Sequence, residues 1–243
     1  MKILKKIILF FIILVLLSPI FYWHSLAVKR LVIKNYYQLQ ALLPSVLDKG
    51  LTANLDVHFY KQERALSCEI AALRMVLNYY GEHVSENDLI TQLSFETRSS
   101  RSPNNIWGDP NKGFVGDING QMPDSGYGVY EGPIALVANH YRKAQALNGS
   151  SLAYILEQVA AGRPVIVWGH IGSGKDISWH TSEGEPIKAI YGEHARVVVG
   201  FSGPISAPKY LVVLDPIYGK EVWSANRFLK NWTLLDNRAV VVY

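Results

Sequence analysis

The chain contains a single cysteine, Cys68, among its 243 residues. An intramolecular disulfide is therefore impossible, which excludes a small fold held together by disulfides. A free cysteine is most often a small buried hydrophobic residue. Cys68 could have that ordinary role, and only the residues around it can decide otherwise.

The sequence also lacks a basic excess outside its N-terminal part. The chain has 24 basic and 20 acidic residues, and six of the basic residues precede Asp48, the first acid, which leaves 18 basic residues for the rest. Nucleic-acid binding depends on neutralising phosphates with Lys and Arg, so no nucleic-acid partner is expected. Apolar residues make up 49% and charged residues 18%, which excludes a disordered chain and fits one packed domain.

Residues 1–30 predict a signal peptide or a membrane anchor. Three lysines precede an unbroken apolar run over 7–17, which resumes over 20–23. About 20 apolar residues can span a bilayer. Residues 25–27 also form a small-x-small sequence at which a signal peptide could be cleaved. We therefore expect export, with the domain outside the cell on a single-pass anchor in the cell membrane, or secreted if the segment is cleaved. Residues 31–52 would be a linker or helix.

Hydrophobic periodicity over residues 53–243 favours one α+β domain, because most helices precede most strands instead of alternating with them. Residues 98–133 carry many glycines and prolines and predict a long irregular segment that is ordered against the domain. Helices are expected over 67–80, from 85, over 134–147, 151–161 and 225–230, and strands over 53–59, 165–168, 187–191, 194–201, 210–214 and 238–243.

Cys68 lies in the first turn of the predicted helix 67–80, with Ser67 as its N-cap. The positive end of the helix dipole favours the thiolate, the nucleophilic form of cysteine, so a lowered thiol pKa is expected. Gln62, six residues earlier, could aim its side-chain amide at the same point as the Cys68 backbone N–H. Two such donors would form an oxyanion hole. Taken alone, Gln62 fits a solvated loop residue equally well.

A cysteine nucleophile needs a base, and His194 is the best placed of the seven histidines. It opens a predicted strand, while Asp215 ends the next one before Pro216. If the two strands pair as an antiparallel hairpin, His194 and Asp215 lie side by side at one sheet edge. That is the arrangement of a base and the residue that orients it. Taken alone, Asp215 could also be a turn residue before a proline.

Together these motifs resemble the papain-like cysteine peptidases, in the branch similar to the double-glycine leader peptidases of bacteriocin export. The resemblance rests on the order of Gln62, Ser67-Cys68-Glu69, Gly192-Glu193-His194-Ala195 and Leu214-Asp215-Pro216, and it extends over roughly residues 53–243. It implies a papain-like α+β fold, with the nucleophile at a helix start in an N-terminal helical part and an antiparallel sheet in the C-terminal part. It also implies that Cys68 is the nucleophile, His194 the general base and acid, Asp215 the orienting residue and Gln62 the oxyanion donor.

Other motifs are weaker, and no cofactor, metal or nucleotide is expected. Residues 169–175 match most of a phosphate-binding loop, but Asp176 stands where Ser or Thr would hold magnesium. A loop that begins at Asp109 would lack the glycine at position 6 and the closing glutamate at position 12 of a calcium loop. The histidines and acids of the second half show no zinc-ligand spacing.

The predicted function is thiol-dependent hydrolysis of a peptide or amide bond outside the cytoplasm, through an acyl-enzyme on Cys68. The partners would be a peptide or protein substrate and, through residues 1–30, a membrane. Two alternatives remain open at this point. The same site could serve a cell-wall amidase, a deamidase or a transpeptidase, or the domain could be a tethered peptide-binding module without catalysis.

Overall fold

The computed structural model describes residues 51–243, and the predictions for residues 1–50 lie outside this part. Within it, no helix has the length and apolar character needed to cross a bilayer. The main helices are α3 (Cys68–Tyr79), α4 (Glu86–Gln92), α5 (Glu131–Asn139), α6 (Leu152–Ala160) and α7 (Ala225–Trp232). The strands of the main sheet are β1 (Ala53–Asn54), β4 (Ala144–Leu147), β5 (Val165–His170), β8 (Glu193–Ser202), β9 (Tyr210–Asp215), β10 (Gly219–Ser224) and β11 (Ala239–Val242).

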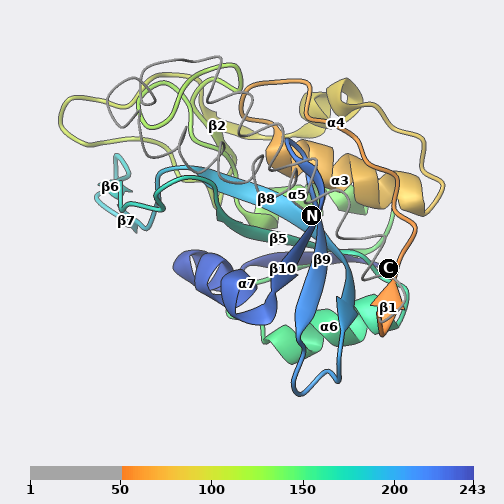
Figure 1. Ribbon diagram of the computed structural model, residues 1–243. Helices are drawn as coiled ribbons and strands as arrows, with labels where there is room; N and C mark the ends of the chain where they lie inside the picture. The colour runs from red at the N-terminus through yellow and green to blue at the C-terminus, as the bar shows by residue number, and fades with distance from the viewer. Residues whose placement is uncertain (1–50) are drawn as a thin grey trace, which may run out of the picture. The chain divides into compact units, whose positions relative to one another are not determined.

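The main sheet is antiparallel and runs in the order β10-β9-β8-β5-β11-β4, with β1 paired to β8. In Figure 1, α3, α4 and α5 lie over one face of this sheet, while α6 and α7 lie over the other. Both the expected α+β class and the antiparallel sheet are confirmed. The long central strand β8 pairs with β5 on one side and with β9 on the other.

Two hydrophobic cores follow from the alternation of side chains along the strands. In β8, Val197 and Val199 pack with the core that contains α3 and α5, whereas Val198 packs with the core that contains α6 and α7. In β9, Val212 packs with the core that contains α3 and α5, and Val213 packs with the core that contains α6 and α7. Strands buried on both faces read as continuous apolar runs, which is how both strands appear in the sequence.

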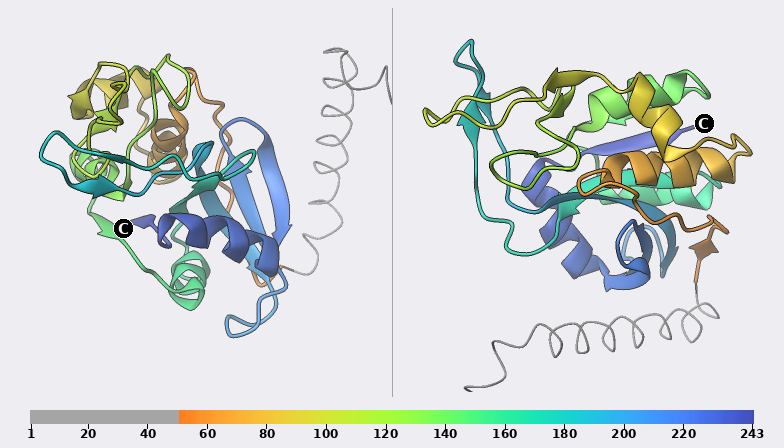
Figure 2. Two further views of the ribbon diagram at one scale, coloured as in Figure 1. Left: turned by 90° about the vertical axis from the view of Figure 1, so that its left-hand side faces the viewer. Right: turned by 90° about the horizontal axis from the view of Figure 1, so that it is seen from above.

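The Gly- and Pro-rich residues 98–133 form the ordered irregular segment that the sequence predicts. The segment contains β3 (Phe114–Val115), which pairs in parallel with β2 (Phe95–Thr97). A second excursion, residues 171–192, contains the short strands β6 (Trp179–His180) and β7 (Pro186–Ile187). The two are joined where the indole N–H of Trp179 donates to the Gly108 carbonyl. In both views of Figure 2 the segment 98–133, coloured yellow to green, and the segment 171–192, coloured teal to cyan, run side by side.

Three predicted elements differ from the structure. Residues 134–147 are not one helix, since α5 ends at Asn139 and residues 144–147 form β4 against β11. The strand expected over 53–59 is reduced to β1, and the one expected over 187–191 begins at Pro186 and ends at Ile187. Strand β10 was not anticipated, because its alternation Lys220–Ser224 is short and mixed in polarity. In each case tertiary pairing decides the outcome more than local pattern does.

A buried ion pair fixes the C-terminal strand to α5. Arg238, just before β11, donates through Nη1 to both carboxylate oxygens of Glu131 at 2.9 and 2.7 Å. Both residues are 7% exposed, and the guanidinium also lies 4.0 Å from the ring centre of Tyr130. Removing one partner of a buried pair leaves an uncompensated charge, which is much more costly than removing a surface pair.

We therefore expect Arg238→Met to lower the free energy of unfolding by about 3–5 kcal/mol. The matched control is Lys188→Met, which breaks the exposed pair with Asp236 and should cost less than about 1 kcal/mol. Urea unfolding of the full-length chain measures both. Similar losses in the two variants would contradict the structural role given to the Glu131–Arg238 pair.

Candidate active site

Cys68 is the first residue of α3, as the sequence predicts, and its side chain is almost fully buried at 4% exposure. Ser67 occupies the N-cap position, but its hydroxyl does not cap the helix. The hydroxyl instead donates to the Glu86 carboxylate, which also accepts from the Glu63 backbone N–H. The loop that leads into α3 is thus fastened to the start of α4, and this fixes where the thiol lies.

His194 and Asp215 lie side by side, and the predicted hairpin is confirmed. His194 Nε2 is 3.0 Å from Asp215 Oδ1, across the β8–β9 pair. The same carboxylate oxygen accepts from the backbone N–H groups of Ile217 and Tyr218, at 2.8 and 3.2 Å. Its other oxygen accepts from Arg196 Nε at 2.7 Å. Asp215 is therefore fully engaged, and its orientation fixes that of the imidazole.

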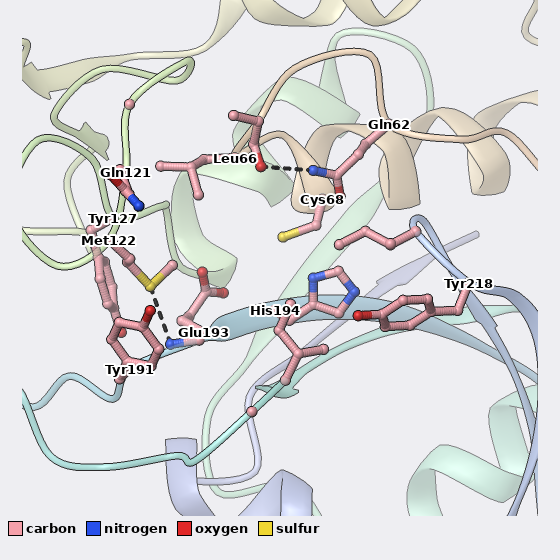
Figure 3. Close-up of a pocket in the computed structure, with 16 residues that line it drawn as sticks. Gln62, Leu66, Cys68, Gln121, Met122, Tyr127, Tyr191, Glu193, His194 and Tyr218 are labelled. Atoms are coloured by element: carbon pink, nitrogen blue, oxygen red, sulfur yellow. Dashed lines mark hydrogen bonds between the residues drawn. The ribbon is translucent and has the colours of Figure 1, made fainter. Parts of the chain in front are cut away.

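Cys68 and His194 line one pocket of about 400 Å³. Figure 3 shows the imidazole just below Cys68, while the sulfur itself lies on the side toward Glu193. Because Nε2 is committed to Asp215, Nδ1 is the ring nitrogen left to exchange a proton with the thiol. The other lining residues come from the loop before α3, from the two excursions, from the start of β8 and from the turn after β9: Gln62, Ala65, Leu66, Gly120, Gln121, Met122, Tyr127, Ile171, Gly172, Tyr191, Gly192, Glu193, Ile217 and Tyr218.

The His194–Asp215 pair combines a neutral imidazole with an ionised carboxyl. Burial lowers the pKa of His194, and the nearby Arg196 guanidinium lowers it further, which outweighs the opposing effect of Asp215. Burial alone would raise the pKa of Asp215. His194, Arg196 and the Ile217 N–H more than offset this, so the pKa of Asp215 lies below its ordinary value.

The expectation of a lowered Cys68 pKa is wrong for this resting state. Burial raises the pKa of the Cys68 thiol well above its ordinary value, and the carboxyl groups of Glu69 and Glu193 raise it further. The N–H of Ala195, 3.4 Å from the sulfur, acts in the opposite direction without prevailing. The sequence argument considered the helix dipole but not two acids beside the sulfur, and these favour the neutral thiol.

Gln62 lines the pocket, but its amide is not free to serve an oxyanion. Its Nε2 donates to the carbonyls of Arg64 and Ala65, both at 2.9 Å. Exchanging the amide oxygen and nitrogen would place an oxygen against those two carbonyls, so this orientation is the favourable one. The predicted oxyanion geometry is therefore not present at rest. In this state Gln62 holds together the turn that leads to Cys68.

Sequence reasoning gives no role to three residues of the site. Arg196 is one of them, although its place two residues after His194 on a strand is the signal that could have revealed it. The other two, Glu69 and Glu193, directly follow and precede the catalytic candidates in sequence. Among residues 51–243, one group of acids, thiols or imidazoles is close enough to hold a metal ion, and it consists of Cys68, Glu69 and Glu193.

The ionised state of Asp215 can be tested through stability. Its folded-state pKa is depressed, so its contribution is fully present above the unfolded value of about 3.9 and is lost as the pH falls through the folded value. We expect the difference in unfolding free energy between the parent protein and Asp215→Asn to shrink between pH 5 and pH 2. Chemical denaturation at a series of pH values measures it. A difference that stays constant over this range would show that Asp215 is not held ionised.

Comparisons with known proteins identify the family of this chain. The model of the Peptidase_C39 like family matches residues 54–240. YvpB of Bacillus subtilis (strain 168) is 35% identical over 206 residues, covering 80% of this chain and 77% of that protein, although its name assigns no activity. A C39-like peptidase from Bacillus anthracis, solved by crystallography, has a TM-score of 0.67 and 26% identity, covering 79% of this chain and 96% of that one.

A double-glycine motif protease of an AMS/PCAT transporter, solved with its leader peptide, is more distant, with a TM-score of 0.44 and 16% identity over 79% of this chain and 94% of that one. The family match spans most of the sequence and includes Cys68, His194 and Asp215. The chain has a cysteine peptidase fold and belongs to the Peptidase_C39 like family.

Proposed function

We propose that this protein hydrolyses peptide or amide bonds through an acyl-enzyme on Cys68. The observation that supports this most strongly is that the chain's single thiol shares a pocket with a buried His194–Asp215 pair. A nucleophile, a base and a group that orients the base are the parts that covalent acyl transfer needs. Family membership adds weight to this reading but does not name a substrate.

The geometry suggests the following sequence of proton transfers. The Cys68 thiol, which donates to Glu69 Oε2 at rest, turns toward His194 Nδ1 and gives up its proton to that nitrogen as the sulfur attacks the substrate carbonyl carbon. The same nitrogen then returns the proton to the leaving amine as the C–N bond breaks and the thioester remains. Water, deprotonated by His194, hydrolyses the thioester and regenerates the thiol. Asp215 keeps the ring oriented and stabilises its transient positive charge. Because thiol and imidazole are both neutral at rest, proton transfer accompanies substrate attack in this scheme.

The lining of the pocket bears on the class of substrate. The walls are mainly aliphatic and aromatic, and the lining contains no lysine or arginine while it includes Glu193. Tyr191, 42% exposed, stands at the rim. An acidic side chain beside the scissile bond would have no cation to meet there. We propose that substrates carry no acidic residue next to the scissile bond.

We also propose that the protein acts outside the cytoplasm, attached to the membrane or released from it. The support is the sequence of residues 1–30, with lysines before a long apolar run. A lone thiol in that setting is exposed to oxidants, which gives a reason for its burial.

Cleavage of a peptide library by the full-length chain tests the activity. We expect Cys68→Ala to lose all cleavage, because it removes the chain's single thiol. His194→Ala should lose at least about 10²–10⁴-fold, the usual contribution of a general acid and base. The matched control is His83→Ala, an exposed histidine near the end of α3, which should cleave like the parent.

Cleavage that persists in Cys68→Ala would contradict the proposal. Mass analysis of the products separates hydrolysis from the alternatives, since transfer of the acyl group to an amine would indicate a transpeptidase and loss of ammonia a deamidase or amidase. A parent protein that binds peptides but leaves them intact would be a binding module.

Gln62→Ala distinguishes its two possible roles. Because the amide now bonds the carbonyls of Arg64 and Ala65, its loss should loosen the turn before Cys68 and lower turnover and thiol alkylation together. A fall in turnover of about 10²–10³-fold with alkylation unchanged would instead show that the amide swings toward the substrate and acts as an oxyanion donor.

A further inference from the structure

Two buried carboxyl groups flank the Cys68 thiol and have no part in the scheme above. Glu69 follows Cys68 in α3 and is fully buried, and Glu193 precedes His194 in β8 and is 3% exposed. One oxygen of each and the Cys68 sulfur all lie within 4.8 Å of one another. Acids are almost never buried in this way without a partner, so their presence beside the nucleophile needs a cause.

Glu69 accepts a hydrogen bond from the Cys68 thiol. Cys68 Sγ lies 3.2 Å from Glu69 Oε2, and the Val129 backbone N–H donates to Glu69 Oε1 at 2.8 Å. The sulfur also accepts from the Ala195 N–H. These contacts hold the sulfur between one donor and one acceptor, with its own proton directed at the Glu69 carboxylate.

Glu193 is buried without a hydrogen-bond partner among the described residues. Neither of its carboxylate oxygens has a hydrogen bond among the described residues, although both are buried. The backbone of residues 127–129 closes over the two acids so tightly that a Cβ on Gly128 would lie 2.5 Å from an oxygen of each. Gly128 adopts φ +154° and has no side chain to compete for that space. The excursion over 98–133 thus covers the acid pair.

This enclosure does not tolerate several negative charges. Two close carboxyl groups in a buried site cannot both ionise, and a third charge on the sulfur would be still more costly. Burial raises the pKa of Glu69 to about 7 and, together with Glu69, that of Glu193 well above its ordinary value. Glu86 from α4 acts on Glu69, while Arg196 from β8 and Arg238 before β11 act on Glu193. Glu193 in turn acts on Tyr127 and Tyr130 of the covering segment, and His194 lines the same pocket as Cys68.

We propose that Glu69 and Glu193 hold one proton between them, so that one is ionised and the other neutral, and that they act as positioning residues that hold Cys68 as a neutral thiol until substrate arrives. The proposal rests on Cys68 being the nucleophile of the proposed function. Only one negative charge is then present among the three groups, and at rest it lies on the carboxyl pair. The thiolate, and not the thiol, is the form that oxidants attack. The pair therefore protects a lone thiol between turnovers.

The test is the pH dependence of Cys68 alkylation by iodoacetamide in the full-length chain. The midpoint of that curve reports the thiol pKa independently of access to the sulfur. The parent midpoint should lie above about 8.5, the value of a free thiol. Glu69→Gln keeps an oxygen for the Val129 N–H and offers the sulfur a donor where it now meets an acceptor. Its midpoint should fall by at least one unit, which is about tenfold faster alkylation at a pH below both midpoints.

Glu193→Gln should shift the midpoint in the same direction and loses no hydrogen bond, so it decides the matter if Glu69→Gln folds poorly. The matched control is Glu63→Gln, which removes an acid that is half exposed near the same helix start and should leave the midpoint unchanged. Oxidation of Cys68 by hydrogen peroxide at pH 7 should be faster in both buried variants and unchanged in the control.

An unchanged or raised midpoint in folded Glu193→Gln would overturn the proposal. So would a parent midpoint that EDTA shifts, because a bound cation and not a shared proton would then balance the two acids. These results do not depend on peptide cleavage. Shifted midpoints without cleavage would refute the proposed function alone, while cleavage with unshifted midpoints would refute the shared proton alone.

Discussion

The site depends on the antiparallel pairing of β8 with β5 and β9. Four consecutive residues at the start of β8 meet the other parts of the site: Glu193 approaches Glu69, His194 and Arg196 bond Asp215, and the Ala195 N–H reaches the sulfur. A one-residue slip in this register would exchange the two sets of side chains. Residues Val197 to Phe201, buried between the two cores, make such a slip costly. The hydrophobic pattern of one strand therefore positions the chemistry.

Burial of the site explains why the Cys68 thiol and the His194 imidazole are both neutral at rest. Low solvent access disfavours the charged forms of Cys68 and His194, whereas Asp215 accepts enough hydrogen bonds to remain ionised. Cys68 has an acceptor where a thiolate would need donors, and His194 has Arg196 nearby. The resting state resembles a thiol enzyme before activation more than one with a preformed ion pair. In the proposed mechanism, substrate entry changes this balance.

Much of this arrangement could be predicted from the sequence. The local sequence pattern predicts that Cys68 starts a helix. It also predicts that His194 and Asp215 meet at one edge of a hairpin, because Pro216 ends the second strand. Spacing also brings Gln62 close to Cys68, and Gln62 lines the pocket. The direction of its amide depends on two carbonyls within its own turn, which spacing alone does not reveal. The Glu69–Glu193 pair is a tertiary contact between residues far apart in the chain. Its sequence signal is that each acid adjoins a catalytic candidate.

The central claim is that Cys68 carries the acyl group of the substrate. The most direct measurement is mass spectrometry of the full-length chain, quenched in acid within seconds of mixing with a peptide ester. The account predicts a mass increase equal to the acyl group on the proteolytic fragment that contains Cys68, and none in Cys68→Ala. Product formation without any adduct on that fragment, at a rate that Cys68→Ala matches, would contradict it.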